Sequence, residues 1–390
     1  MGSRSQLRLL MLTPNFPPQT GGVQNYALEL AFAFSELCSE FEVLAPKSPG
    51  SEQVDRELPF KIKRKSIWGD NFSLSGILPA RRASRHFDAV FATHWSAAYA
   101  ALIAGDQNWA VGCAVHGKEL FFRPLEKIWP AQKVYDHIRK TALKQCPLLF
   151  PVSRFTADLL KKYEVKEDRI ITVPNGVNTE RYKPGDSTQL REGLGLVSKT
   201  VLLTVGRLVE RKGVDTVLKS LATIKDEHKD LEYLIVGDGP ERSKLEALSQ
   251  KLGLSEQVRF MGAVTSKALL EFYQLADLFV MAPRDIRGDV EGFGLVFLEA
   301  SACGKAVLGT RSGGVPDAVL DGVTGVLVSP DNSMELARVL DDLIKNKDKR
   351  DALGTAGFEF ANQQGSWKGR AHTIVESFEE ELLDREKRIK

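Results

Sequence analysis

The sequence predicts an α/β protein with two doubly wound parallel sheets, each covered by helices on both faces. Short β-branched or apolar runs alternate with longer segments of helical periodicity along the chain, as in strands joined by crossover helices. The pattern restarts after Asn175–Ser198, a turn-rich segment for which no regular element is predicted. The length of 390 residues, at roughly 150 residues per domain, also favours two domains over one.

Seven strands are predicted between residues 7 and 173. Each is a short β-branched or apolar run followed by polar or turn-forming residues. They are Leu7–Thr13, Phe41–Ala45, Phe60–Lys65, Phe87–Ala92, Ala110–Val115, Leu148–Val152 and Ile170–Val173. A helix is predicted directly after the first strand, because Val23, Tyr26, Leu30 and Phe34 recur at three- and four-residue steps and form one apolar stripe.

Six further strands are predicted between residues 201 and 328. They are Val201–Val205, Tyr233–Val236, Val258–Met261, Leu278–Met281, Ala306–Leu308 and Gly325–Val328. We therefore predict a first domain at 1–180 and a second at 181–365. The segment 366–390, with Ile374, Phe378 and Leu382 on one side, is predicted to be a helix that packs back on the first domain. Because ligands of such sheets bind beyond the carboxyl ends of the strands, loops of the two domains are predicted to face one another across a cleft.

The composition excludes several classes of protein. Lys and Arg total 53 against 51 Asp and Glu, a net charge of +2, which is too even for a protein whose main partner is a nucleic acid. The four cysteines show no spacing typical of a zinc site or a disulfide framework. The apolar stretch Leu9–Leu12 is too short for a signal peptide or a spanning helix. We expect a protein of the reducing cytoplasm.

Two candidate sites follow predicted strands of the first domain. Gly21 and Gly22 directly precede the first helix, and glycines there allow amides at a helix start to approach an anion. His116 follows the strand Ala110–Val115, where its side chain is able to donate to a sugar hydroxyl or a carbonyl. Each has an ordinary alternative: a simple strand-to-helix turn, and a histidine that only satisfies a local hydrogen bond.

Two further candidates lie in the second domain. In GRLVERKG, Arg207 and Lys212 follow a strand, and a guanidinium and an ammonium on one loop are both able to reach the oxygens of a diphosphate. In DVEGFGLVFLEA, Glu291 and Glu299 stand eight positions apart with glycines before a helix start between them, an arrangement able to span a nucleotide sugar. The alternatives are a solvated charged turn and a chance spacing of glutamates.

Several well-known motifs are absent from the sequence. It contains no Asp-x-Asp pair, and the nearest approach is Asp289-Val290-Glu291, so a carboxylate-held Mg²⁺ or Mn²⁺ that bridges a diphosphate is not expected. It also contains no G-x-S-x-G, G-x-x-x-x-G-K-[ST] or H-E-x-x-H. These absences argue against the commonest hydrolases, nucleotide triphosphatases and zinc proteases.

Taken in chain order, these motifs resemble the family 4 retaining glycosyltransferases of the GT-B fold, over nearly the whole chain. The motifs are the glycine loop, His-Gly after a strand, Pro-Asn-Gly-Val, Gly-Arg-Leu with Arg-Lys-Gly, Gly-Asp-Gly-Pro and Glu-Gly-Phe-Gly-Leu-Val-Phe-Leu-Glu. Within the family, NFPPQTGGVQNY, LAPKSPG, VHGKE and DVEGFGLVFLEA are most similar to bacterial phosphatidylinositol-mannoside mannosyltransferases. The resemblance implies two Rossmann-like domains, the first on the acceptor side and the second binding the donor.

The resemblance also implies roles for individual residues. Arg207 and Lys212 would bind the donor diphosphate, with Gly22 against it from the other domain. Glu291 would meet hydroxyls of the donor sugar, Glu299 would bind the ribose, and His116 would stand near the transferred sugar. The remaining donor-binding positions implied are Gly21, Gly206, Gly237, Gly239, Pro240, Phe293, Gly294, Leu295 and Val296.

The activity implied is transfer of a hexose from a nucleotide diphosphate sugar, with retention, to a lipid-linked or saccharide acceptor. GDP-mannose is the expected donor, and no cofactor or metal is expected. No double-displacement carboxylate is implied, so we expect departure and attack on the same face of the sugar. Two alternatives stay open: a UDP-hexose-dependent transferase of the same fold, and a nucleotide-sugar-binding scaffold without catalysis.

An anionic membrane surface is a further candidate partner, which would place the protein at the cytoplasmic membrane face. Aromatic and basic residues together suit a headgroup region, although such stretches also form ordinary surface loops. Two clusters of this kind lie in the first domain: Trp68, Phe72, Arg81, Arg82 and Arg85, and then Phe121, Phe122, Arg123, Lys127, Trp129 and Lys133. The acceptor loops Ser48–Glu57 and Gly69–Arg85 contain no motif with a recognisable chemistry.

Overall fold

The computed structural model describes residues 4–66, 77–83, 85–105, 109–121, 123–363 and 365–389. The chain forms two compact units. Unit 1 comprises Met1–Asn175 and Trp367–Lys390, and unit 2 comprises Gly176–Ser366. The chain thus passes from unit 1 to unit 2 at Asn175, within the turn-rich segment, and returns at Trp367.

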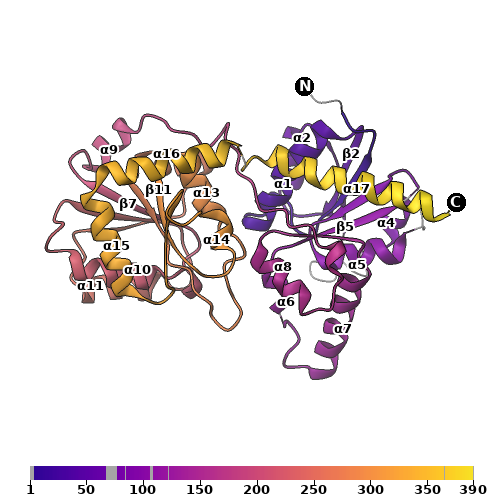
Figure 1. Ribbon diagram of the computed structural model, residues 1–390, viewed down its shortest axis with the longest axis horizontal. Helices are drawn as coiled ribbons and strands as arrows, with labels where there is room; N and C mark the ends of the chain where they lie inside the picture. The colour runs from indigo at the N-terminus through magenta and orange to yellow at the C-terminus, as the bar shows by residue number, and fades with distance from the viewer. Residues whose placement is uncertain are drawn as a thin grey trace. The chain divides into compact units, whose positions relative to one another are not determined.

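Unit 1 holds a six-stranded parallel sheet in the order β3-β2-β1-β4-β5-β6. Helices α1 and α17 lie side by side on one face of this sheet, and α4, α5 and α7 lie on the other (Figure 1). The elements are β1 (Arg8–Leu12), α1 (Gly22–Leu37), β2 (Glu40–Pro46), α2 (Ser51–Glu57), β3 (Lys61–Lys65), α4 (Ile77–Ala83), β4 (Ala89–Ala92), α5 (Trp95–Ala104), β5 (Ala110–Val115), α6 (Lys118–Phe121), α7 (Trp129–Gln145), β6 (Leu148–Pro151), α8 (Arg154–Lys161) and α17 (Trp367–Ile389).

Unit 2 repeats this topology. Its parallel sheet has the order β12-β11-β10-β7-β8-β9, with α13 and α16 on one face and α10 and α15 on the other. The elements are α9 (Thr188–Leu194), β7 (Thr200–Val205), α10 (Val214–Ile224), β8 (Leu231–Val236), α11 (Arg242–Lys251), β9 (Val258–Gly262), α12 (Ser266–Leu275), β10 (Leu278–Val280), α13 (Leu295–Ala302), β11 (Ala306–Thr310), α14 (Val315–Ala318), β12 (Gly325–Val328), α15 (Ser333–Lys345) and α16 (Lys347–Gln363).

The predicted fold class is confirmed, because both sheets are parallel, doubly wound and covered by helices. Their central strands are buried along most of their length, which explains their continuous apolar runs in the sequence. The predicted first helix is α1, and its apolar stripe is buried: Tyr26, Leu30 and Phe34 are at most 1% exposed.

The carboxyl-terminal helix packs on unit 1, as predicted. Ile374 and Phe378 on α17 are fully buried, and the Phe378 ring lies edge-on to that of Phe150, with 5.9 Å between the ring centroids. At the start of α17 the Trp367 ring contacts Tyr26 of α1, at 5.5 Å. The helix therefore completes one face of the first sheet.

Two predictions about elements are wrong. Ile170–Val173 is not a strand: Ile170 makes a single isolated bridge to Leu149, at the edge strand β6 and directly after a one-turn 3₁₀ helix, Glu167–Arg169. The segment 175–198 is not wholly irregular, because it contains α9. This short helix ends at Gly195, whose φ of +69° is the left-handed conformation that terminates helices, so this glycine is the helix's stop signal.

Candidate functional site

The predicted second-domain residues gather at the point where the strand order of unit 2 reverses. The chain starts at β7 in the middle of the sheet, runs outward to β9, and returns to β10 on the other side of β7. Loops after β7 and β10 therefore diverge from adjacent strand ends, which is where doubly wound sheets bind ligands. Arg207 and Lys212 lie on the loop after β7, and Glu291 lies on the loop after β10.

Glycines allow the loops after β7 and β8 to pack against one another. A Cβ at Gly237 would lie 2.0 Å from the carbonyl oxygen of Gly206, and a Cβ at Gly239 would lie 2.3 Å from that of Leu208. Gly237 has a φ of +133°, a conformation in which only glycine is unstrained. These glycines, with Pro240 after them, thus form a close-packed backbone wall beside Arg207.

Glu291 is the centre of an ion-pair cluster. Its Oε2 accepts hydrogen bonds from Lys212 Nζ and from an Arg211 guanidinium nitrogen, each at 2.6 Å. Arg211 also lies 3.4 Å from Asp289. Burial raises the pKa of the Glu291 carboxyl, but the charges of Lys212 and Arg211 outweigh burial and lower it to about 2. Glu291 is therefore ionised, and the two cations and two carboxylates of the cluster balance.

Arg207 differs from these neighbours because its charge is not neutralised. Its side chain is exposed, and it makes no hydrogen bond or ion pair within the part of the chain that the structure covers. A guanidinium that stands free at the carboxyl end of β7 is available for an anionic ligand. Arg207 is thus the uncompensated cation of this site.

The start of α13 offers backbone donors next to this cluster. Gly294 precedes the helix with a φ of +92°, so that the chain turns sharply after the buried ring of Phe293. The amides of Leu295 and Val296 are in the first turn, where no intrahelical acceptor exists. Positive charge is concentrated at such a helix end. The helix start is able to bind an anion or a hydroxyl oxygen.

Glu299, on the first turns of α13, is held by tyrosines. Its Oε2 accepts a hydrogen bond of 2.6 Å from the hydroxyl of Tyr273 on α12, and Tyr182 donates to it as well. Burial raises the pKa of Glu299 despite the opposing effect of these hydrogen bonds. The carboxylate is fixed by both tyrosines within the wall of unit 2.

The first-domain candidates also lie together, within unit 1. Gly21 and Gly22 stand at the start of α1, and space is open around Gly22. One turn later, the ring of Tyr26 meets His116 edge-on, with 4.7 Å between the ring centroids. His116 Nε2 lies 3.2 Å from the Thr93 carbonyl oxygen, so this nitrogen carries the proton. Burial lowers the pKa of His116, which keeps the imidazole neutral.

The comparisons with known proteins decide the family. Residues 186–360 match the family model of group 1 glycosyl transferases, and residues 20–181 match that of glycosyltransferase family 4. The chain is 30% identical, over 390 aligned positions, to the GDP-mannose-dependent alpha-(1-6)-phosphatidylinositol monomannoside mannosyltransferase of Mycolicibacterium smegmatis. This alignment covers 94% of the present chain and 97% of the relative. The chain belongs to the family 4 glycosyltransferases.

Further relatives agree with this assignment. The glycosyltransferase is 29% identical to the GDP-mannose-dependent monoacylated alpha-(1-6)-phosphatidylinositol monomannoside mannosyltransferase of Corynebacterium glutamicum, over 93% of this chain and 95% of the relative. Its fold matches that of Anabaena HepE, crystallised with UDP, with a TM-score of 0.79 at 20% identity over 96% and 100% of the chains. The sucrose-phosphate synthase of Thermosynechococcus elongatus matches with a TM-score of 0.78 at 20% identity, over 97% and 100%. These structures show that the fold is of the GT-B type.

Three residues of the glycosyltransferase's candidate site were missed by the sequence reasoning. Arg211 stands beside Lys212 in the same motif, but the sequence alone does not show which of two adjacent cations reaches Glu291. Tyr182 and Tyr273 are distant from Glu299 in the sequence, and no sequence motif links either tyrosine to that carboxylate. The contacts of these two tyrosines with Glu299 become visible only in the fold.

The aromatic and basic clusters of the glycosyltransferase are partly visible. Arg81 and Arg82 lie on α4, whereas Trp68, Phe72 and Phe122 lie outside the described residues. On α7, Trp129 is 62% exposed, and the ammonium of Lys133 stands 3.7 Å from the centre of its ring. Within the described ranges, no helix is long and apolar enough to cross a membrane. The same part of the chain holds no group of three or more His, Cys, Asp or Glu side chains placed to bind a metal ion.

Proposed function

We propose that this glycosyltransferase transfers mannose from GDP-mannose to a lipid-linked acceptor that carries a phosphoinositol group. The observation that carries the proposal is the similarity, over nearly the full length of both chains, to relatives named as GDP-mannose-dependent phosphatidylinositol monomannoside mannosyltransferases. The residues at the switch point of unit 2 suit such a donor, because they offer an unpaired cation, a helix start and fixed carboxylates.

We propose further that the reaction proceeds with retention on one face of the sugar. The bond from the anomeric carbon to the diphosphate oxygen breaks, and its electron pair goes to that oxygen. The acceptor hydroxyl attacks the anomeric carbon from the same face and gives its proton to the leaving phosphate. Arg207 and the amides at the start of α13 stabilise the charge that develops on the leaving group. Glu291 accepts hydrogen bonds from hydroxyls of the donor sugar.

Independence from metal ions is part of the same proposal. Negative charge on a leaving diphosphate needs a counter-charge in the transition state. Arg207 is free to supply it, and Lys212 Nζ lies at the same loop. The Arg207 guanidinium and the helix-start amides thus take the role that a divalent cation has in other sugar-nucleotide enzymes.

The choice of donor is tested by thermal stabilisation of the purified protein. A ligand that binds only the folded state raises the melting temperature, by an amount that grows with the logarithm of its concentration relative to its Kd. We expect GDP and GDP-mannose to raise it by several degrees, equally with and without a chelator, and UDP and UDP-glucose to have no effect. Selective stabilisation by UDP-hexoses would move the assignment to another donor, and stabilisation only with added metal would contradict metal independence.

The hydrogen bond from Tyr273 to Glu299 gives a second prediction. If Glu299 binds the ribose, Tyr273→Phe lets the carboxylate rotate and weakens GDP binding about fivefold to tenfold, the size of one ordinary hydrogen bond. Tyr233→Phe is the matched control, because Tyr233 is equally buried and its hydroxyl bonds Thr204 instead.

Calorimetry with ribose analogues separates positioning from simple destabilisation. Tyr273→Phe is expected to reduce the preference for GDP over its 2′,3′-dideoxy analogue, whereas Tyr233→Phe keeps that preference. An unchanged preference in Tyr273→Phe would show that the tyrosine does not act through ribose recognition.

Contact with an anionic membrane surface is the remaining part of the proposal. The exposed Trp129, its neighbour Ile128 and the ammonium of Lys133 combine apolar area with positive charge at the start of α7, which suits a lipid headgroup region. We expect the protein to sediment with phosphatidylglycerol vesicles at low salt, and Trp129→Ala to reduce the bound fraction several-fold. If wild type and Trp129→Ala sedimented with the vesicles to the same extent, α7 would not be part of the membrane contact.

A further inference from the structure

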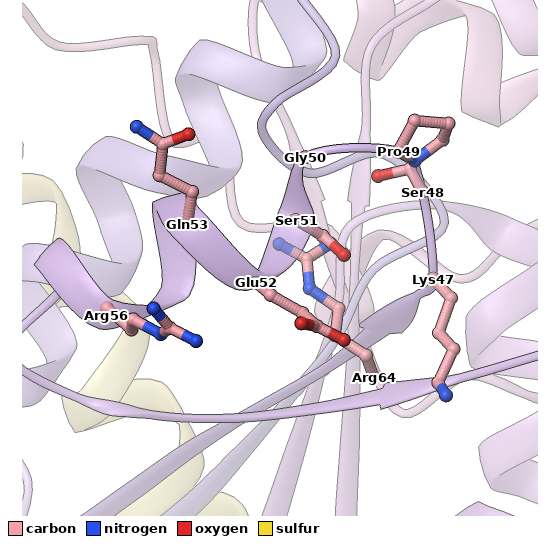
Figure 2. A pocket seen from close by; sticks show the side chains of 9 residues that line it. All are labelled: Lys47, Ser48, Pro49, Gly50, Ser51, Glu52, Gln53, Arg56 and Arg64. Carbon is pink, nitrogen blue, oxygen red and sulfur yellow. The ribbon is translucent and has the colours of Figure 1, made fainter.

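A cavity of about 930 Å³ lies in unit 1 beyond the carboxyl end of β2 (Figure 2). Its wall is formed by the loop from Lys47 to Gly50, the first turns of α2, and a side chain of β3. The charged and hydroxyl-bearing residues that line it are Lys47, Ser48, Ser51, Glu52, Arg56 and Arg64. The cavity therefore occupies the acceptor-loop segment 48–57, whose chemistry the sequence did not reveal.

Arg64 forms a fixed and neutralised part of the wall. Its side chain is only 8% exposed and pairs with Asp55 at 2.7 Å. Its guanidinium also donates to the carbonyl oxygens of Pro46, at 3.0 Å, and Pro17, at 2.6 Å. The bond to Pro17 ties the cavity to the loop that leads to Gly21 and Gly22. Arg64 thus connects the cavity to the candidate site of unit 1 without adding net charge.

Lys47 and Arg56 carry charges that are not neutralised. Both side chains are exposed, and in the described ranges neither makes a hydrogen bond or an ion pair. Two lysines of β3, Lys61 and Lys63, differ from them, because both pair with the buried carboxylate of Glu42, at 2.9 and 2.8 Å. Two unpaired positive charges, those of Lys47 and Arg56, therefore line the cavity.

Two oxygen-bearing side chains complete the lining. The carboxylate of Glu52 lies between the ammonium of Lys47 and the guanidinium of Arg56 in the view of Figure 2, and no ion pair holds it in the part of the chain described here. The Ser48 hydroxyl oxygen is shielded from solvent and has no hydrogen-bond partner there. A buried hydroxyl without a partner costs free energy until a ligand or a water satisfies it.

We propose that this cavity binds the phosphate-bearing polyol of the acceptor. The two unpaired cations suit a phosphate group. The Glu52 carboxylate repels a bare polyanion, but it accepts hydrogen bonds from hydroxyls, as the Ser48 hydroxyl is able to do. A ligand that satisfies all four side chains carries both an anionic phosphate and several hydroxyls. This inference rests on the proposed function in one respect: the proposed function identifies the ligand of the cavity as the headgroup of the acceptor.

Calorimetry on the full chain tests the cavity with water-soluble probes. Myo-inositol 1-phosphate is expected to bind wild type at least tenfold more tightly than inorganic phosphate or myo-inositol. Lys47→Ala and Arg56→Ala should each weaken that binding about tenfold, and Glu52→Gln should remove the preference over inorganic phosphate. Lys166→Ala is the matched control, because Lys166 is an exposed lysine of the same unit that does not line the cavity. All four variants should keep the wild-type melting temperature and GDP affinity.

The outcomes separate this inference from the proposed function. Unchanged inositol phosphate binding in Lys47→Ala and Arg56→Ala overturns the inference, even if mannose transfer from GDP-mannose is observed. Failure of wild type to bind GDP overturns the proposed donor and leaves the cavity result standing. The lipid source is distinguished with vesicles: phosphatidylinositol vesicles should bind better than phosphatidylglycerol vesicles of equal charge. If the protein bound both kinds of vesicle equally and did not bind inositol phosphate, this face would be a general membrane-binding surface, and the inference would be wrong.

Discussion

Arg207→Ala is expected to lower kcat by about 10²- to 10³-fold, the usual cost of removing one group that stabilises transition-state charge. Arg207 is the exposed cation at the carboxyl end of β7 that no described side chain neutralises. Since an exposed, unpaired side chain contributes little to folding, the melting temperature should stay within a degree or two of wild type. Steady-state kinetics with GDP-mannose and thermal melting measure both quantities.

The control for Arg207 is Arg338→Ala, which removes an exposed arginine from α15 in the same unit. This variant should keep both kcat and the melting temperature. If folded Arg207→Ala turned over at a rate near that of wild type, stabilisation of the leaving group would have to come from another residue. Full loss of activity in Arg338→Ala would show instead that unit 2 tolerates no change of surface charge.

Glu291→Gln is expected to lower kcat by about 10²-fold or more, and to destabilise the protein as well. The substitution removes the charge that Lys212 and Arg211 share, each at 2.6 Å. Breaking a buried ion pair by removing one partner costs about 3 to 5 kcal/mol, and the lower end applies because the carboxylate is 13% exposed. Chemical denaturation measures the loss of stability, and kinetics with GDP-mannose measures the loss of rate.

The same substitution changes the dependence of stability on pH. The pKa of Glu291 is lowered from 4.5 to about 2 in the folded state, so its contribution to stability is fully present above about pH 4.5 and is lost as the pH falls towards 2. Over this range the unfolding free energy of wild type should fall more steeply than that of Glu291→Gln. Glu246→Gln, which breaks the exposed pair with Arg242, should follow the wild-type curve. Parallel curves for wild type and Glu291→Gln would contradict the ionised cluster.

The fold class could be predicted from the sequence because both sheets are covered by helices on both faces. A parallel strand that is buried on both faces is nearly continuously apolar, so strands such as β4 and β5 are visible as apolar runs in the sequence. Ile170–Val173 has the same composition but meets only the edge strand, at one bridge. The composition of a segment does not show whether it forms a continuous ladder of hydrogen bonds with the strand beside it.

The candidate site was partly predictable for a related reason. Loops after the strands of a doubly wound sheet must lie at one edge, so the sequence could place Arg207, Lys212 and Glu291 near one another. It could not show that Glu291 is shared by two cations, or that Tyr273 of α12 and Tyr182 of the segment before α9 hold Glu299. The cavity beside Lys47 was equally hidden, because its lining comes from the loop after β2, from α2 and from β3, which the pairing of β2 with β3 brings together only in the fold.

The central claim is mannose transfer from GDP-mannose with retention and without a metal ion. The most direct measurement is nuclear magnetic resonance of the product formed from GDP-mannose and a phosphatidylinositol monomannoside acceptor, with and without excess chelator. We predict a new α-mannosidic linkage, the configuration of the donor, formed at the same rate in both samples. A β-linked product, a reaction that stops in chelator, or transfer only from a UDP-hexose would contradict the account.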